Sequence, residues 1–255
     1  MKFATTKTLL AALSAALLPL GVAAQSPSAY EGFDYADGTN IDSQTGGSGW
    51  SDDWKGNNKI SEANVVTPGL TYTKGDTLPT AGNALNLDAV SAGANVVTIR
   101  TPANQFANDS FWMSGLLELN SSVGNNFVFR ALDSNGQANR IFINNAGDAD
   151  GFKANILSNA GPNEVDFVTN LPEDQAIFLV LQVDLAAGSN GEVNAWINPD
   201  IGPSSPTNSI GSATLSLGAD TGQINNLGVI GGSGSNHTFD EFRLGDSFES
   251  VTAIP

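Results

Sequence analysis

Apolar and polar residues alternate along much of the chain after residue 25, with the period of two that is typical of β-strands. The clearest case is Ile177 to Leu185, in which every odd-numbered position is Ile, Leu or Val while Gln182 and Asp184 fall on the other face. A Gly-Ser-Asn-Gly turn at 188–191 then leads into Glu192 to Asn198, where the alternation resumes. The pattern predicts a β-hairpin with one face in a core and the other partly exposed to water.

Short alternating segments bounded by Gly, Asn, Ser and Asp recur through the rest of the chain, and no amphipathic stretch of ten or more residues predicts a helix after the first 24. The further predicted strands are Ala84 to Val90, Asn95 to Thr101, Phe111 to Leu119, Asn126 to Leu132, Arg140 to Asn144, Phe152 to Leu157, Glu164 to Thr169, Ala213 to Leu217 and Leu227 to Ile230. About a dozen strands favour an all-β fold of two packed antiparallel sheets.

The two ends of this β-region carry similar mixtures of apolar and acidic residues. Ala29 to Tyr35 and Phe239 to Asp246 are predicted to be the first and last strands, meeting in one β-sandwich. Neither a fixed-period repeat nor a Pro- or Ser-rich linker divides the chain between them. Residues 25–255 are therefore predicted to form a single domain.

The first 24 residues have the pattern of a signal peptide. Lys2 and Lys7 give a basic start, an apolar run follows from Leu9 to Ala24, and small residues precede Gln25. We therefore expect export of the chain and cleavage near Ala24, with a secreted or cell-envelope location. No second apolar run is long enough to span a bilayer, so membrane insertion after removal of the leader is not expected.

Composition excludes several classes of function. Without the leader the chain carries 8 basic and 26 acidic residues, a formal charge of −18, which opposes binding to nucleic acid. The absence of cysteine excludes disulfides, thiol nucleophiles and thiolate metal sites. His237, the only histidine, is predicted to be a loop residue and has no neighbouring motif for a catalytic triad. The pattern leaves the oligomeric state open.

Several short motifs resemble those of one group of proteins. They are the Tyr30 to Tyr35 segment, the Gly46-Gly47-Ser48-Gly49-Trp50 stretch, the hairpin from Phe178 to Pro199, and Phe239 to Gly245. Together they resemble bacterial exported concanavalin A-like, or laminin-G-like, jelly-roll proteins. The resemblance implies a concanavalin A-like β-sandwich over residues 25–255. Many such proteins continue into a Pro-Glu-Pro sorting anchor, whereas the printed sequence ends at Pro255, which leaves free release and a shortened sequence as alternatives.

Enzymes occur on this fold, so catalysis must be tested residue by residue. Glu164 and Asp166 occupy alternate positions, as the carboxylates of retaining jelly-roll glucanases do, but Val168 and Thr169 stand where a second glutamate would be needed. The sequence therefore predicts no catalytic residues. A polysaccharide-cleaving glycoside hydrolase or lyase remains the alternative reading.

Two aromatic groupings suggest binding. Trp50 and Trp54 flank Asp52 and Asp53, so indole rings could stack on sugars while carboxylates accept hydroxyl hydrogen bonds. Packing of one or both indoles against the core is the competing interpretation. Trp112 and Trp196 lie opposite the aliphatic phases of their strands, and either core packing or an exposed glycan-binding sheet face would explain them.

A calcium site is a further candidate. Asn144, Asp148 and Asp150 concentrate oxygen ligands in one tight loop, as hard cations require, although the closing glutamate of a full calcium loop is missing. An ordinary Asx-rich turn is the alternative, and no cofactor is required by the rest of the pattern. The function predicted from the sequence is weak polysaccharide recognition by a noncatalytic exported protein; a structural surface protein without a specific ligand is the other alternative.

Overall fold

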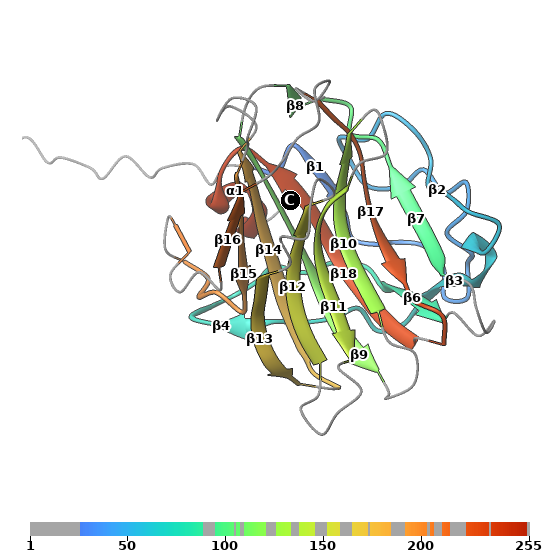
Figure 1. Ribbon diagram of the computed structural model, residues 1–255. Coiled ribbons are helices and arrows are strands. Elements are labelled where there is room, and N and C mark those ends of the chain that lie inside the picture. The colour runs from blue at the N-terminus through green and yellow to red at the C-terminus, as the bar shows by residue number, and fades with distance from the viewer. Residues whose placement is uncertain are drawn as a thin grey trace, which may run out of the picture.

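The computed structural model describes residues 26–88, 95–104, 106–107, 110–120, 126–133, 138–145, 152–158, 165–172, 174–184, 192–202, 205–206, 211–214, 223–234 and 236–253. Almost all regular structure in these ranges is β, and two antiparallel sheets face each other (Figure 1). The predicted all-β jelly-roll sandwich is confirmed.

The first sheet has the order β16-β15-β14-β9-β18-β6-β3, with β1 also paired to β18. Its strands are β1 (Ala29–Glu31), β3 (Ala63–Val66), β6 (Ala84–Asp88), β9 (Ser110–Asn120), β14 (Ala176–Asp184), β15 (Glu192–Ile197), β16 (Gly211–Thr214) and β18 (Asn236–Gly245). The predicted hairpin is β14–β15, and the pairing of Val183 with Val193 and of Leu181 with Ala195 gives its register.

The second sheet has the order β13-β12-β11-β10-β17-β7-β2, with β8 also paired to β17. Its strands are β2 (Lys55–Gly56), β7 (Val96–Arg100), β8 (Phe106–Ala107), β10 (Asn126–Asp133), β11 (Ala138–Asn145), β12 (Phe152–Ser158), β13 (Val165–Leu171) and β17 (Gln223–Gly231). The remaining elements are the 3-10 helix η1 (Ile60–Glu62), the short strands β4 (Thr73–Lys74) and β5 (Asp76–Thr77), and the helix α1 (Phe248–Thr252).

The first and last strands meet, as the sequence predicts. Ala29 pairs with Leu244 and Glu31 pairs with Phe242, so the β1 segment lies antiparallel to β18. The same β18 also pairs with β6 and β9. The C-terminal strand is therefore a central strand of its sheet, and its contacts join parts of the chain that are far apart in sequence.

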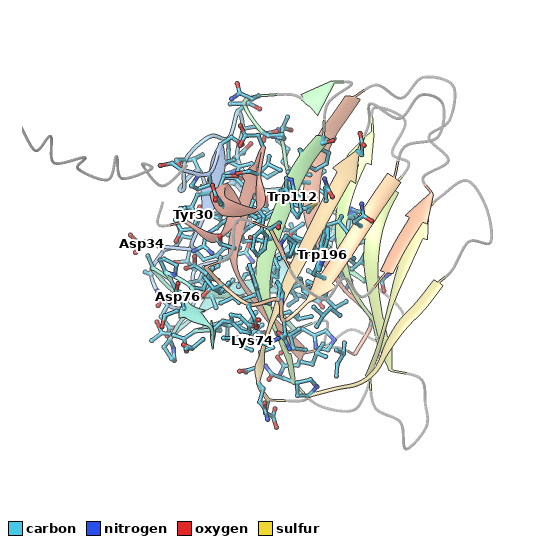
Figure 2. All side chains as sticks on the ribbon, turned by 90° about the vertical axis from the view of Figure 1, so that its left-hand side faces the viewer. Tyr30, Asp34, Lys74, Asp76, Trp112 and Trp196 are labelled. Atoms are coloured by element: carbon cyan, nitrogen blue, oxygen red, sulfur yellow. The ribbon has the colours of Figure 1, made fainter. Side chains whose placement is uncertain are left out.

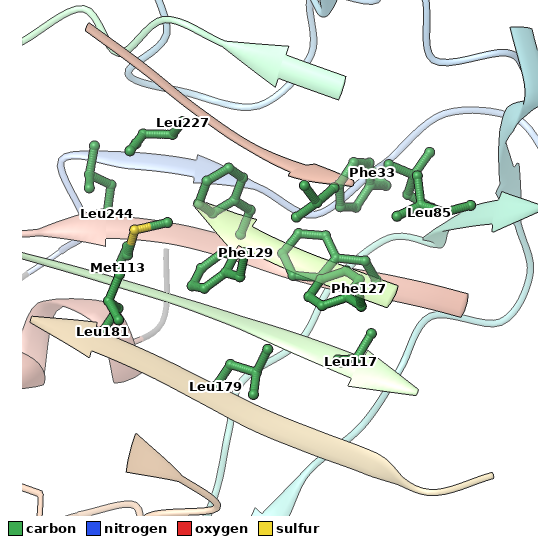
Figure 3. Packing of buried hydrophobic residues seen from close by; sticks show 14 of the residues in the cluster. Phe33, Leu85, Met113, Leu117, Phe127, Phe129, Leu179, Leu181, Leu227 and Leu244 are labelled. Carbon is green, nitrogen blue, oxygen red and sulfur yellow. The ribbon is translucent and has the colours of Figure 1, made fainter. Parts of the chain in front are cut away.

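The core lies between the sheets. Met113, Leu117 and Leu181 of the first sheet face Phe127 and Phe129 of the second (Figure 3). These side chains are fully buried, and each contributes on the order of 1.5–3 kcal/mol through the apolar surface that it removes from water. With no disulfide in the chain, this core is the principal source of stability.

A second apolar cluster covers the outer face of the first sheet. Phe178 and Val180 of β14 pack there with Trp196, Phe248 of α1 and neighbouring loop residues. The expectation that this face of β14 is partly exposed to water is therefore right only near Gln182 and Asp184, which stay partly exposed. No helix among the described residues is long and apolar enough to cross a membrane.

A β-bulge changes the alternation in β18. The pairing with β9 shifts between Asp240 and Arg243, and Glu241 has a positive φ of 58°. As a result Phe239 and Phe242 both point into the core, although they are three residues apart. Strict alternation would place Asp240 on the same face as Phe242, but the extra residue at Glu241 puts the two side chains on opposite faces.

Candidate functional site

Trp54, predicted as a sugar-stacking residue, lies in the core instead. Its side chain is fully buried, and its ring stacks on Phe33 with the centroids 5.7 Å apart. Its Nε1 donates a hydrogen bond to Glu31 Oε2 at 3.1 Å. An indole enclosed in this way offers no face to a ligand, so the core-packing alternative holds for Trp54 and a stacking role is excluded in this conformation.

Trp54 lies against a buried ion pair that joins the two sheets. Arg100 of β7 donates through Nη1 to Glu31 Oε2, and both side chains are almost completely buried. Glu31 also accepts hydrogen bonds from Phe33 N and Tyr35 Oη, each at 2.9 Å. Burial, with the adjacent Glu31 carboxylate, raises the pKa of Tyr35 above its usual range. The surrounding indoles shield this charged group from water.

Trp50 takes an intermediate position between the core and the surface. Its Nε1 donates to the Tyr30 carbonyl oxygen at 3.0 Å, and its ring lies 5.4 Å from that of Phe242. The guanidinium of Arg100 stands 5.1 Å from the Trp50 ring centroid, a cation–π geometry. The indole remains partly exposed and is held in one orientation.

A glycine-rich turn at residues 46–49 determines where the chain places Trp50. Ser48 and Tyr30 exchange backbone hydrogen bonds of 2.8 and 2.9 Å, so the turn lies directly against β1. At Gly49, which has a φ of +76°, a Cβ would come within 2.6 Å of Ala29 Cα. The Gly-Gly-Ser-Gly sequence therefore permits a close backbone approach that places Trp50 beside Arg100.

The carboxylates between the tryptophans lie at the surface. Asp52 accepts from Thr101 N and Thr101 Oγ1 at 2.9 Å and from Lys55 Nζ at 2.8 Å. Partial burial alone would raise the pKa of Asp52, but the hydrogen bonds from Lys55 and Thr101 outweigh it and the pKa falls below its ordinary value. Asp53 lies 3.5 Å from the same Lys55 ammonium. Lys55 therefore lies within ion-pair distance of both carboxylates.

Together these residues form an open pocket of about 290 Å³, lined by Thr45, Trp50, Ser51, Asp52, Asp53 and Arg100. The structure thus brings three of the four residues predicted for ligand binding to one pocket, and it buries Trp54 behind Trp50 in the core. A partly exposed indole, two carboxylates and two hydroxyl-bearing residues can together contact the apolar and polar surfaces of a sugar. We call this the Trp50 pocket.

A polar pocket of about 390 Å³ lies elsewhere, beneath the Pro68–Thr71 loop, and its walls include Glu118, Asp174 and Thr238. Sequence reasoning missed this site because the loop joins residues that are distant in the chain. Beside it, Asp240 Oδ2 accepts from Leu70 N at 2.8 Å. Burial, with the nearby Glu241, raises the pKa of Asp240 to about 9. Asp240 anchors this loop.

Trp112 and Trp196 lie on the outer face of the first sheet (Figure 2). Their rings stack across β14 with centroids 5.1 Å apart and planes inclined by 24°. Trp196 is only 7% exposed, whereas Trp112 is partly exposed and also contacts Phe248 at 5.9 Å. The core-packing interpretation holds for Trp196, whereas Trp112 reaches the surface and glycan binding by it stays a prediction.

His237 lies in β18 and is fully buried, so the prediction of a loop residue is wrong. Its ring meets Phe127 edge-on at 6.4 Å, and burial lowers its pKa to about 4. The Gly-Ser-Asn residues before it favour a loop, but the strand begins at Asn236 and includes His237. An enclosed imidazole at this position cannot reach a substrate in this conformation.

The predicted calcium loop lies largely outside the described residues. Asn144 belongs to β11, where only the backbone is described, and Asp148 and Asp150 fall beyond it. Within the described ranges no group of three or more His, Cys, Asp or Glu residues could hold a metal ion. Glu164 is likewise outside them, and Asp166 is described as backbone in β13. Calcium binding stays a prediction.

No family model matches the chain, and no curated protein matches it. Among solved structures, endo-β-1,4-glucuronan lyase from the fungus Trichoderma reesei shows 12% identity and a TM-score of 0.46 over 89% of this chain and 98% of that one. The globular domain of T. cruzi calreticulin shows 8% identity and a TM-score of 0.47, covering 78% and 86%. Caenorhabditis elegans galectin LEC-6 shows 11% identity and a TM-score of 0.38, covering 62% and 94%. Similarity at this level concerns the fold and assigns no activity.

Proposed function

We propose that this chain is an exported, noncatalytic β-sandwich protein of the extracellular matrix or cell envelope that recognises polysaccharide. The proposal rests chiefly on the Trp50 pocket, where a partly exposed indole stands beside Asp52 and Asp53. Sugar recognition combines an apolar ring face with hydroxyl groups, and this pocket offers a partner for each. The leader pattern of residues 1–24 supports export.

Order in the free protein favours binding at this pocket. The Trp50 indole is fixed by its hydrogen bond to the Tyr30 carbonyl, and Asp52 is fixed by Thr101 and Lys55. Side chains that are already held lose little conformational entropy when a ligand arrives. The pocket is small and open, so we expect weak affinity for one or two sugar rings, with avidity where many copies meet a polymer.

A binding experiment on residues 25–255 tests this proposal. Retardation in gels containing neutral polysaccharides is measured for the unaltered protein, Asp53→Ala and Asp42→Ala. Asp42 is an exposed acid that does not line the Trp50 pocket, which makes it a charge-matched control. We expect Asp53→Ala to weaken retardation and Asp42→Ala to leave it unchanged. Equal retardation of all three proteins would show that the Trp50 pocket does not bind the polysaccharide.

The same mixtures are assayed for new reducing or unsaturated sugar ends. The proposal expects none to form. Formation of such ends would support the alternative of a polysaccharide-cleaving enzyme. An absence of both binding and cleavage across the panel would favour a structural surface protein instead.

A further inference from the structure

The outer face of the first sheet carries a row of residues that are chemically suited to a glycan. Antiparallel register places Trp112 of β9 beside Gln182 of β14, Gln182 beside Asn194 of β15, and Asn194 beside Ser212 of β16. Residues paired in this way share one face of a sheet. The row therefore crosses four neighbouring strands, and we call it the Trp112 row.

The dimensions of the row suit an extended polymer. Three inter-strand spacings of roughly 4.8 Å give a length of about 14 Å, which accommodates more than one sugar ring. The indole stands at the end formed by β9, and the two amides follow it on β14 and β15. A chain lying across the strands would meet an aromatic surface first and hydrogen-bonding groups afterwards.

The amides are joined to each other but keep further capacity. Asn194 Nδ2 donates to Gln182 Oε1 at 3.3 Å. This bond leaves the Gln182 amide with both N–H donors and the Asn194 amide with its carbonyl oxygen. Both side chains are partly exposed. Adjacent donors and acceptors of this kind complement sugar hydroxyls, each of which both donates and accepts.

Two aromatic neighbours fix the orientation of the Trp112 indole. Trp112 stacks on Trp196 at 5.1 Å and touches Phe248 of α1 at 5.9 Å, while Ser114 Oγ fastens α1 to the sheet by donating to the Val251 carbonyl at 2.8 Å. Trp196 Nε1 is buried and donates to no acceptor among the described residues. Because this N–H is enclosed, Trp196 supports the Trp112 ring from within the cluster and is not itself one of the ligand contacts of the row.

Charge indicates which polysaccharides fit. Asp184 stands next along β14 on the same face as Gln182, and its register partner on β15 is Glu192. The chain as a whole has a formal charge of −16, or −18 without the leader residues. A polyuronate or sulfated polymer would be repelled, whereas an uncharged one would not.

We propose that the Trp112 row binds a single extended chain of an uncharged polysaccharide, with Trp112 stacking on a sugar ring and Gln182 and Asn194 binding its hydroxyls. This inference rests on the proposed polysaccharide recognition, but it adds a second surface formed by different strands from those around the Trp50 pocket. The longer row would select the polymer, and the Trp50 pocket would contact one or two sugar rings.

The test compares variants of the two surfaces in the whole protein. Binding of Trp112→Ala, Gln182→Ala and Asp53→Ala to hydroxyethylcellulose, galactomannan, xyloglucan and polygalacturonate is measured by affinity electrophoresis, with folding checked by circular dichroism. Trp112→Ala could weaken binding simply by disturbing the packing of the sheet. Gln182→Ala tests the same row without that risk, because Gln182 is a partly exposed surface residue. We expect Trp112→Ala to bind at least one neutral polymer with about tenfold lower affinity than the unaltered protein. The loss of affinity in Gln182→Ala should be severalfold smaller than that in Trp112→Ala.

The outcomes separate the two proposals. The Trp112 row is supported if Trp112→Ala and Gln182→Ala both lose affinity for the neutral polymer while Asp53→Ala keeps part of its binding. Loss confined to Asp53→Ala overturns the row and leaves the proposed function standing. Preferential binding to polygalacturonate overturns the neutral specificity. No binding of the unaltered protein to any polymer overturns both proposals.

Discussion

Glu31 on β1 and Arg100 on β7 form a buried ion pair that joins the two sheets of the sandwich. The charges are enclosed by Trp50 and Trp54, whose ring centroids lie 5.1 and 5.7 Å from the Arg100 guanidinium carbon. Burying two charges is costly unless further hydrogen bonds satisfy them, and Tyr35, Trp54 and the Phe33 amide supply those bonds to Glu31. Trp54 is thus a structural residue of this motif, whereas Trp50 both encloses the ion pair and reaches the pocket.

Arg100→Met should therefore destabilise the protein strongly. It leaves the Glu31 carboxylate buried without its cation, which typically costs about 3–5 kcal/mol. The free energy of unfolding in urea measures the effect, with Lys55→Met as the control because Lys55 forms an exposed ion pair with Asp52. We expect little change for the control. The double variant Glu31→Leu/Arg100→Met should lose less unfolding free energy than the two single variants lose in total. A loss equal to that total would show that the two residues are not coupled.

His237 should make stability depend on acidity. Its pKa is about 4 in the folded protein, below the ordinary value of 6.5, because burial disfavours the charged ring. The unfolded chain takes up this proton below about pH 6.5, so the stabilising contribution is complete above that pH and is lost as the pH falls toward 4. We expect the wild-type protein to lose about 2–3 kcal/mol more than His237→Gln between pH 7 and pH 4.5. Identical losses in urea titrations of the two proteins would contradict this.

Gly49 and Gly38 offer a matched comparison. Both have a φ of +76°, but a Cβ on Gly38 would meet nothing within 4 Å, whereas one on Gly49 would clash with the backbone of Ser28 and Ala29. Gly38→Ala should cost about 1–2 kcal/mol from backbone strain alone. Gly49→Ala should lower the melting temperature considerably further, because it separates the turn from β1. Similar melting temperatures would mean that the close approach has no energetic importance.

Calcium chelation should leave binding at the Trp50 pocket intact. Lys55 already lies 2.8 Å from Asp52 and 3.5 Å from Asp53, so the two carboxylates have a cation within reach. Retardation by neutral polysaccharides is compared in calcium and in EDTA. Loss of binding in EDTA that calcium restores would point to a metal site and would direct attention to Asn144, Asp148 and Asp150.

The elements with strong alternation and the pairing of the two terminal strands could be predicted from the sequence, whereas the bulge and the buried side-chain contacts could not. Ile177 to Leu185 appears as β14 almost without change, and the pairing of the first and last strands is confirmed. The bulge at Glu241 could not be foreseen, because it depends on the register of β18 against β9. It also brings Glu241 beside Arg243 at 2.5 Å, forming a second buried ion pair.

The candidate site shows the same division. Trp50, Asp52 and Asp53 are neighbours in sequence, so their grouping could be read directly. The burial of Trp54 depends on Glu31 and Arg100, which are 23 and 46 positions away. The Trp112 row depends on the register of four strands, and only the opposite phase of the two tryptophans in their strands hinted at it.

The most direct test of the account is retention of purified residues 25–255 on an insoluble neutral polysaccharide, with the supernatant assayed for released sugar ends. We expect the protein to be retained specifically, to be released by soluble neutral polymer, and to liberate no sugar ends. Release of sugar ends, or a failure to be retained on any neutral polysaccharide, would contradict it.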